Sequence, residues 1–288
     1  MFAVMTLPGA EEHIAKEIKS IYNTAEAAAI AGLVIENITG QSLTERISHK
    51  KYLLDEKQVD QLHRFVSRLR QHEPVQYVLN EVWFYGFKFY VDRNVLIPRP
   101  ETEELVDWVI KDCKFPINEL SILDIGTGSG CIPVSLKRKL RRADVWSCDV
   151  SEAALEVARR NAVAIGSDVN FITLDFLNVE QRKTLPAFDI IISNPPYVPE
   201  NNKEQMRDNV LKYEPALALF VPDDDPMLFY KTIAGFAGTH LHPRGAIYLE
   251  IHEDLGKAVS KLFTDNNYTT EIKKDMQGKE RMVKATAG

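Results

Sequence analysis

The strongest constraint on the fold is a regular alternation of strand-like and helical segments after residue 120. The strand-like segments are short, apolar and rich in β-branched residues, and stretches with helical periodicity separate them. Repeated strand–helix units predict a parallel sheet joined by right-handed crossovers. The predicted strands cover residues 121–125, 145–149, 169–173, 188–193 and 246–251, with two closing strands at 268–272 and 281–285.

The first part of the chain has a different pattern. Apolar residues recur there at helical spacing, as in Ile14 and Ile18, and Pro74 ends the last helical stretch. Aromatic and β-branched residues then gather around Gly86, which predicts a β-hairpin. We therefore expect a helical domain over residues 1–73, a β-hairpin linker over 74–97 and an α/β domain over 98–288.

Composition excludes several classes of function. The formal net charge of −6 counts against a protein that wraps duplex nucleic acid, because phosphate neutralisation needs a basic surface. The three cysteines form no C-x-x-C pair and the seven histidines show no metal-ligand spacing, so we expect neither disulfides nor a metal site. No stretch approaches the roughly 18 apolar residues of a membrane-spanning helix. A cytoplasmic protein fits these features best.

A glycine-rich loop follows the first strand of the α/β region. Its pattern is D-x-G-x-G-x-G, and glycines at these positions permit a tight turn and close backbone approach to a ligand. Cys131 stands where a dinucleotide fingerprint has a small residue, and the chain lacks the G-K-[ST] of a phosphate-binding loop. A tight turn without a ligand is the alternative. The candidate binding residues are Gly126, Thr127, Gly128, Ser129 and Gly130.

Acidic residues follow the next two strands. Asp149 ends the second strand, where a carboxylate can accept hydrogen bonds from both hydroxyls of a ribose. Asp175 and Phe176 follow the third strand and could hold an adenine by its amino group and its face. Each aspartate, judged singly, could instead cap a helix. A nucleoside site without a phosphate anchor points to S-adenosylmethionine as the cofactor.

Four polar or rigid residues follow the fourth strand: Asn194, Pro195, Pro196 and Tyr197. The Asn194 side-chain oxygen and the Pro195 carbonyl can both accept hydrogen bonds from one planar NH2 group, and the Tyr197 ring can stack on its plane. Ligands of parallel sheets gather at the carboxyl ends of the strands, so this loop and the cofactor should face each other. Asn194 is therefore also a candidate for contact with the cofactor. A rigid turn without chemistry is the alternative.

The same four residues suit methyl transfer to nitrogen. An amide or aminated-base nitrogen is a poor nucleophile because its lone pair is delocalised. Two acceptors on its protons direct the lone pair, and they also stabilise the positive charge that the nitrogen gains as it attacks a methyl carbon. No strong general base is then required before transfer. We therefore predict that Asn194, Pro195, Pro196 and Tyr197 are the catalytic residues.

Taken together, these motifs resemble the HemK/PrmC family of release factor glutamine methyltransferases. The motifs that carry the resemblance lie between about residues 74 and 251: IPRPETE at 97–103, DIGTGSGCI at 124–132, Asp149 with Ser151, NPPYVP at 194–199 and YEP at 213–215. Two positions depart from the family pattern: Phe176 stands where some members have Trp, and His252 follows Glu250 and Ile251 where a Gly is usual.

The resemblance implies a class I S-adenosylmethionine-dependent methyltransferase fold, a Rossmann-like sheet with a small N-terminal helical domain and a β-hairpin linker. It also implies methyl transfer from S-adenosylmethionine to the side-chain amide nitrogen, N5, of the Gln in the Gly-Gly-Gln loop of peptide chain release factors. By the same resemblance, the glycine loop and Asp149 hold the cofactor, Phe176 lies on its adenine, residues 194–197 bind the Gln amide, and the helical domain holds the release factor.

Two other functions remain open at the level of sequence. NPPY also occurs in DNA adenine-N6 methyltransferases, and Arg64, Arg68 and Arg70 could contact phosphate, although no base-reading domain is visible. A non-catalytic scaffold could bind the cofactor and recognise a partner through the hairpin and the helices. The complete NPPY loop argues against the scaffold.

Overall fold

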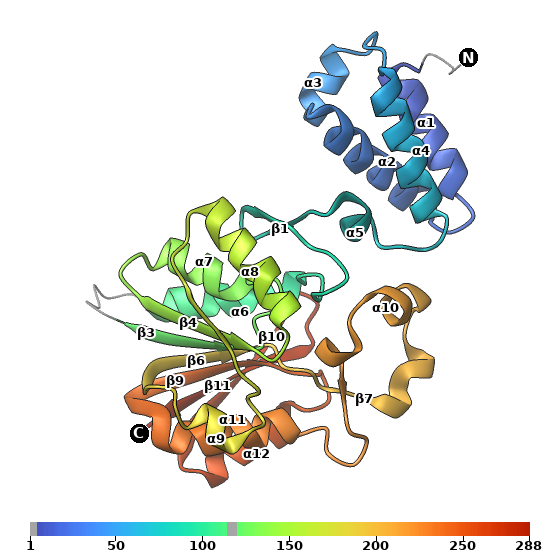
Figure 1. The fold of residues 1–288 in the computed structure, drawn as a ribbon. Helices are drawn as coiled ribbons and strands as arrows, with labels where there is room; N and C mark the ends of the chain where they lie inside the picture. Colours follow the sequence, from blue (N-terminus) through green and yellow to red (C-terminus); the bar gives the residue numbers. More distant parts are fainter. Residues whose placement is uncertain (1–4, 114–119) are drawn as a thin grey trace. The chain divides into compact units, whose positions relative to one another are not determined.

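The computed structural model describes residues 5–113 and 120–288 (Figure 1). The chain forms two compact units, which are described separately. Unit 1 consists of Met1–Asn80 together with Arg207–Tyr213, and unit 2 consists of Glu81–Met206 together with Glu214–Gly288. No helix in the described part of the chain is both long enough and apolar enough to cross a membrane.

Unit 1 is helical, as the sequence predicts. Polar side chains cap the first four helices: Thr6, Asn23, Ser42 and Asp55 each accept a hydrogen bond from a backbone N–H in the first turn. Gly40 ends the second helix in the left-handed conformation. The helices are α1 (Leu7–Ile18), α2 (Thr24–Thr39), α3 (Leu43–Ser48), α4 (Glu56–Leu69), α5 (Val75–Leu79) and α10 (Asp208–Tyr213).

Helix α5 was not expected from the sequence, where residues 75–79 read as the start of the hairpin region. The helix is short because Asn80 terminates it with a φ of 55°. Its Val78 and Leu79 side chains are buried in the core of unit 1. The guanidinium of Arg68 donates to the carbonyls of Tyr77 and Val78 at 2.9 and 3.0 Å. These two carbonyls of the last turn thereby gain hydrogen-bond partners. Tertiary contacts therefore select the helix.

Unit 2 contains a seven-stranded sheet with the order β10-β11-β9-β6-β3-β4-β5. The predicted parallel arrangement holds for the five strands from β9 to β5, whereas β11 pairs antiparallel with both β9 and β10. The strands are β3 (Ser121–Ile125), β4 (Asp144–Asp149), β5 (Asn170–Thr173), β6 (Phe188–Ser193), β9 (Leu241–Glu250), β10 (Tyr268–Lys274) and β11 (Glu280–Ala287).

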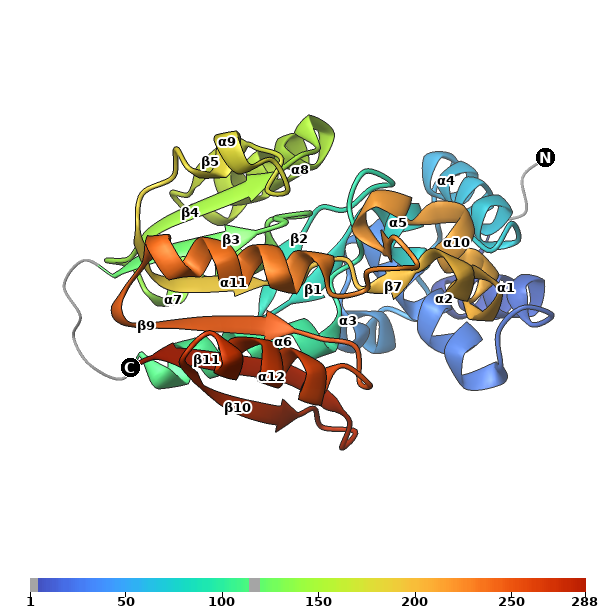
Figure 2. The same cartoon turned by 90° about the horizontal axis from the view of Figure 1, so that it is seen from below.

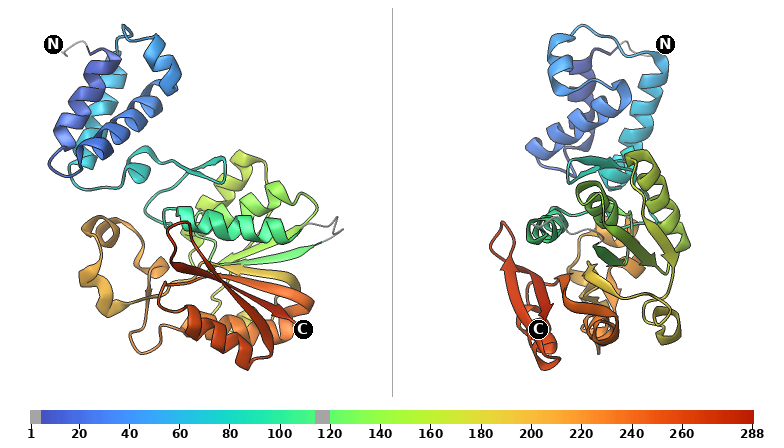
Figure 3. Two further views of the ribbon diagram at one scale, coloured as in Figure 1. Left: turned by 180° about the vertical axis from the view of Figure 1, so that it is seen from behind. Right: turned by 90° about the vertical axis from the view of Figure 1, so that its left-hand side faces the viewer.

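Helices cover both faces of this sheet, as Figures 2 and 3 show. One apolar core lies between the sheet and α11 and α12, and a second lies between the sheet and α6 and α7. The helices of unit 2 are α6 (Pro100–Asp112), α7 (Cys131–Lys139), α8 (Glu152–Ile165), α9 (Val179–Arg182), α11 (Leu228–His240) and α12 (Gly256–Asp265). Short elements complete the unit: β7 (Val198–Pro199), β8 (Phe220–Val221), η1 (Glu200–Gln205) and η2 (Ala216–Ala218).

The predicted hairpin forms, but it is confined to β1 (Val82–Phe84) and β2 (Phe87–Phe89). Tyr85 and Gly86 turn the chain with φ angles of 49° and 81°, the left-handed conformation that a two-residue hairpin turn requires. Phe84 and Phe89 are buried and meet edge to face at 6.0 Å in the core beside α6. The hairpin is therefore anchored to unit 2 by its aromatic rings.

Candidate active site

The parallel register brings the predicted site segments to one edge of the sheet. Ile125 pairs with Cys148 on one side and with Ser193 on the other, so the glycine loop, Asp149 and the NPPY loop begin at adjacent strand ends. The Ser193 hydroxyl also donates to the Ile125 carbonyl at 2.7 Å. Gathering of these loops at the carboxyl edge agrees with the expectation from the sequence.

The glycine loop is tightly folded and packed from behind. Gly126, Gly128 and Gly130 have φ angles of 81°, 51° and 80°, which favour glycine. A Cβ at Gly130 would lie 3.0 Å from the Cβ of Ala158 on α8, whereas at Gly126 or Gly128 it would meet no described atom within 4 Å. The first two glycines therefore face open space, and the third permits close approach of a helix.

A cavity of about 320 Å³ opens beside this loop within unit 2. Several of the predicted site residues line it together: Gly126, Gly128, Asp149, Asp175, Phe176, Asn194, Pro195 and Pro196. Thr127, Ser129, Gly130 and Tyr197 do not line it. Thr127 and Ser129 are buried behind the loop, where the Thr127 hydroxyl accepts a hydrogen bond from Ser147. The Thr127 side chain therefore holds the loop from behind.

The Asp149 carboxylate holds the glycine loop from the cavity side. One oxygen accepts from the backbone N–H of Gly128 and the other from that of Ser151, each at 2.9 Å. Burial raises the pKa of Asp149, and these backbone hydrogen bonds oppose that effect. Because each carboxylate oxygen can accept two hydrogen bonds, Asp149 retains acceptor capacity for a ligand. Ser151 also caps α8, because its side chain accepts a hydrogen bond from the backbone N–H of Ala154.

Asp175 and Phe176 reach the cavity from the end of β5. The Asp175 carboxylate accepts from the backbone N–H of Leu177 at 2.9 Å, which shapes the turn. Phe176 is only 5% exposed, and its ring meets that of Phe236 edge to face at 5.2 Å. The core therefore anchors Phe176, which is also one of the residues that line the cavity. Contact with an adenine remains a prediction for both residues.

The NPPY loop divides between the cavity and the core. Asn194 is half-buried, and its Nδ2 donates to the hydroxyl of Thr102 at 3.2 Å. The Tyr197 ring packs against the core and meets the His252 ring at 6.0 Å. Burial raises the pKa of the Tyr197 phenol, so this group stays neutral at physiological pH. His252, which departs from the family pattern, thus touches the last residue of the loop.

Three residues that contribute to the site were not identified from the sequence. Thr102 and Glu250 are both 2% exposed, and the Thr102 hydroxyl donates to the Glu250 carboxylate at 2.6 Å. Glu214 accepts from the backbone N–H of Ile97 at 3.2 Å and from the Arg99 guanidinium at 2.6 Å. Thr102 belongs to IPRPETE and Glu214 to YEP, so these motifs were visible, but their partners depend on the tertiary fold.

The cavity wall also explains which ligands fit. Two aspartates and mostly apolar groups line it, and no lysine or arginine does so within the described residues. Phosphate groups would meet no cationic partner there, whereas a positively charged or neutral nucleoside is compatible with the carboxylates. The remaining wall consists of Asn94, Val95, Leu96, Ile125, Cys148, Val150, Ser151, Ala154, Leu174, Leu177, Pro215, Leu217, Ala218 and Phe229.

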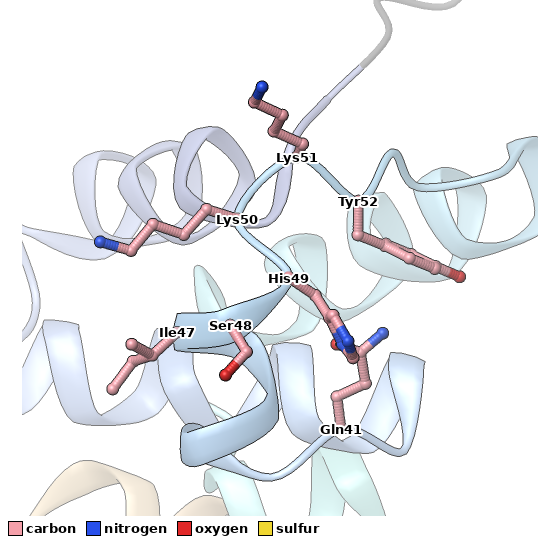
Figure 4. Close-up of a pocket in the computed structure, with 7 residues that line it drawn as sticks. All are labelled: Gln41, Ile47, Ser48, His49, Lys50, Lys51 and Tyr52. Atoms are coloured by element: carbon pink, nitrogen blue, oxygen red, sulfur yellow. The ribbon is translucent and has the colours of Figure 1, made fainter.

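A second hollow lies on unit 1, at the surface between α3 and the segment that leads to α4. Figure 4 shows its lining, in which the Lys50 and Lys51 side chains extend in different directions instead of converging on one point. His49 interacts with Gln41 at 3.3 Å. None of the predicted site residues lines this hollow. In the described part of the chain no group of three or more His, Cys, Asp or Glu residues is arranged to hold a metal ion.

The fold is similar to that of methyltransferases of known structure. A methyltransferase from Pyrococcus furiosus is 21% identical, with a TM-score of 0.51 over 71% of this chain and 90% of that one. The Thermus thermophilus 16S rRNA N2 G1207 methyltransferase, solved in complex with AdoMet and guanosine, is 16% identical, with a TM-score of 0.50 over 72% of this chain and 50% of that one. The predicted class I methyltransferase fold is confirmed.

Comparison with family models and curated sequences identifies the family. The PrmC N-terminal domain model matches residues 12–79, and the Methyltransferase small domain model matches residues 109–213. The release factor glutamine methyltransferase of Flavobacterium psychrophilum is 42% identical, covering 93% of this chain and 94% of that protein. That of Bacteroides thetaiotaomicron is 38% identical, covering 95% and 97%. The resemblance in the sequence is thus confirmed, and the chain belongs to the family of release factor glutamine methyltransferases.

Proposed function

We propose that this protein transfers a methyl group from S-adenosylmethionine to the side-chain amide nitrogen, N5, of the Gln in the Gly-Gly-Gln loop of peptide chain release factors. One observation carries the proposal: residues from both assigned groups line a single cavity within unit 2. Gly126, Gly128, Asp149, Asp175 and Phe176 come from the cofactor group, and Asn194, Pro195 and Pro196 come from the group assigned to the substrate amide. Family membership supports the same activity.

The residues of the cavity fit the cofactor. Gly126 and Gly128 allow close approach of a ligand, because they present backbone without side chains toward open space. The free lone pairs of Asp149 suit a ribose, and Asp175 with Phe176 suits an adenine. S-adenosylmethionine supplies a methyl group on a positively charged sulfur, and a cavity with two carboxylates and no lining lysine or arginine among the described residues suits that charge.

The NPPY loop prepares the substrate nitrogen. The Asn194 Oδ1 and the Pro195 carbonyl accept the two protons of the Gln amide and thereby direct its lone pair toward the cavity. As the nitrogen gains positive charge during attack, the same two oxygens stabilise it. The surplus proton leaves to water after transfer. Pro196 keeps the loop rigid, and the Tyr197 ring anchors the end of the loop in the core.

DNA adenine-N6 methylation is less well supported. Two of the three arginines that could contact phosphate already have partners within unit 1. Arg68 forms a two-pronged pair with Glu73, with both contacts at 2.8 Å, and Arg70 approaches Glu17 at 3.3 Å. We therefore assign unit 1 to binding of the release factor in the cytoplasm and assign it no role in binding nucleic acid.

A labelling experiment tests the proposed function. The purified protein is incubated with S-adenosylmethionine carrying an isotopically labelled methyl group and with a purified release factor, and the modified residue is mapped by mass spectrometry. We expect one labelled methyl on the Gln of the Gly-Gly-Gln loop. The control is a release factor in which that Gln is replaced by Ala. Labelling of the control to the same extent, or labelling of duplex DNA instead, would contradict the proposal.

A further inference from the structure

Three side chains form a continuous hydrogen-bonded chain behind the NPPY loop. Ser193 on β6 pairs with Leu249 on β9, so Asn194 and Glu250 follow at the ends of neighbouring parallel strands. Thr102, in the first turn of α6, connects them: it receives a hydrogen bond from Asn194 Nδ2 at 3.2 Å and donates one to Glu250 Oε2 at 2.6 Å.

The chemistry of the three groups gives this chain a direction. An ionised carboxylate only accepts hydrogen bonds, so Glu250 takes the single hydroxyl proton of Thr102. The Thr102 oxygen can then only accept from Asn194, which means that Asn194 must turn its NH2 group toward Thr102. The Asn194 oxygen then points away from Thr102, toward the cavity, where it can accept a hydrogen bond from a ligand. Among the described residues, no group donates a hydrogen bond to that oxygen.

Packing alone cannot enforce this orientation. The oxygen and NH2 ends of an asparagine have nearly the same size and shape, so only hydrogen bonds distinguish the two orientations. If the amide were reversed, Asn194 would present N–H groups to the N–H groups of the substrate amide. Donor would then face donor, and the nitrogen would lose one of its two acceptors.

We propose that Thr102 and Glu250 are positioning residues that orient the Asn194 amide so that its oxygen faces the substrate. The inference rests on the proposed function, because it takes Asn194 to receive the substrate NH2 group. Neither residue lines the cavity, so both act through Asn194.

The surroundings of Glu250 make this orientation dependent on pH. Burial raises the pKa of Glu250 to about 7, while the Thr102 hydrogen bond and the positive charge of Arg281 lower it. Below that pKa, protonated Glu250 no longer requires the Thr102 proton, which becomes available to the Asn194 oxygen. The ionisable groups that act on Glu250 or respond to it are Arg281 on β11, Arg99 and Glu101 at the start of α6, Cys131 on α7, Tyr197 in the NPPY loop and Tyr230 on α11.

The orientation can be observed without any substrate. Selective ¹⁵N labelling of asparagine, with Asn194→Ala for assignment, identifies the Asn194 side-chain NH2 signals in an NMR spectrum of the full chain. We expect these signals to move with pH around a midpoint near 7 in the wild type. They should stay fixed in Glu250→Gln. Glu101→Gln is the matched control, because it removes a neighbouring carboxylate that raises the Glu250 pKa; the movement should persist with a lower midpoint.

Kinetics supply the second readout. We expect kcat of the wild type to rise with pH through about 7 and this rise to be absent in Glu250→Gln. Thr102→Val should lower kcat roughly 10- to 100-fold with the cofactor Kd unchanged within about threefold, and Thr102→Ser should restore kcat, because serine keeps the hydroxyl.

NMR signals of Asn194 that do not change with pH in the wild type, or a Thr102→Val variant with wild-type kcat, would overturn the inference. Failure of the wild type to methylate a release factor would instead refute the proposed function, and the NMR titration would still decide the orientation.

Discussion

Arg99 and Glu214 form an ion pair at 2.6 Å although 115 positions separate them in the sequence. The Glu214 side chain is 1% exposed, so its carboxylate is withdrawn from water, whereas the Arg99 side chain is 35% exposed. The carboxylate also accepts from the backbone N–H of Ile97. The pair therefore joins the chain before α6 to the segment after Glu214, in which Pro215, Leu217 and Ala218 contribute to the cavity wall.

We predict that Glu214→Ala destabilises unit 2 and weakens cofactor binding. The substitution leaves a guanidinium and a buried N–H without their acceptor, which costs on the order of 2–4 kcal/mol. Urea denaturation measures the stability, and isothermal titration calorimetry with S-adenosylmethionine measures the affinity. Glu200→Ala serves as control, since its ion pair with Lys203 is exposed and should contribute little. Equal effects of the two substitutions would contradict the role of Glu214.

Asn194→Ala should separate binding from chemistry. We expect kcat to fall on the order of a hundredfold, because one of two oxygens that stabilise the developing charge is lost. The cofactor Kd should change little, since the glycine loop and Asp149 remain. Calorimetry and steady-state kinetics with a release factor measure both quantities. Asn201→Ala, at an exposed position of η1, is the control. Unchanged turnover in Asn194→Ala would favour a non-catalytic scaffold.

Alanine at two glycines of the cofactor loop should have different consequences. Gly130→Ala places a methyl group against Ala158 and forces a residue with a side chain to a φ of 80°, so it should lower the stability of unit 2 the most. Gly128→Ala meets open space at a φ of 51°, so it should chiefly weaken cofactor affinity by filling the cavity side of the loop. Thermal unfolding and calorimetry compare the two variants; the reverse ranking would contradict this assignment.

The stability of unit 2 should decrease as pH rises through neutrality. Burial raises the pKa of Asp124 from 3.8 to about 7, while hydrogen bonds from Ser147 and Thr127 lower it. A raised pKa means that the folded state favours the protonated carboxyl. Its stabilising contribution is complete below pH 4 and is lost as pH approaches 7 and above. Unfolding free energies at pH 5 and pH 8 should differ less in Asp124→Asn than in the wild type, and an equal pH dependence would contradict this prediction.

Arg68→Ala tests the assignment of unit 1. Arg68 bonds Glu73 and the carbonyls that end α5, so its loss should lower the melting temperature of the protein. Affinity for duplex DNA, measured at low and moderate salt, should be weak and should not change. A loss of salt-dependent DNA affinity in Arg68→Ala, with an unchanged melting temperature, would revive the nucleic-acid alternative.

The sequence predicts most of the sheet because its strands are buried, apolar runs. The boundaries of β3 and β6 agree with the prediction residue by residue. Strand β9 begins at Leu241, five residues before the predicted start of residue 246, because the polar, proline- and glycine-containing stretch 242–245 has no strand-like pattern. Helix α5 was missed for the opposite reason: contacts with Arg68 and the core of unit 1 determine it, and local pattern does not.

The sequence allows prediction of which residues line the cavity where they lie at a strand end, whereas their binding and catalytic roles stay predictions. Asp149, Asn194 and Pro195 reach the cavity because parallel strands deliver their ends to one edge. Thr102 and Glu250 were missed because their importance comes from a hydrogen-bonded chain between segments far apart in the sequence. A single sequence contains no signal for such pairing.

The irregular stretch in β9 allows the length of this strand to vary without a change in the geometry of the cavity. Phe188 pairs with Leu241 and Ile190 with Ala246, so two steps along β6 correspond to five along β9. From Ile190 onward the pairing is regular and ends with Ser193 beside Leu249. Insertions or deletions within 242–245 can therefore be absorbed at the far end of the sheet, and the neighbourhood of Asn194 and Glu250 is insulated from them.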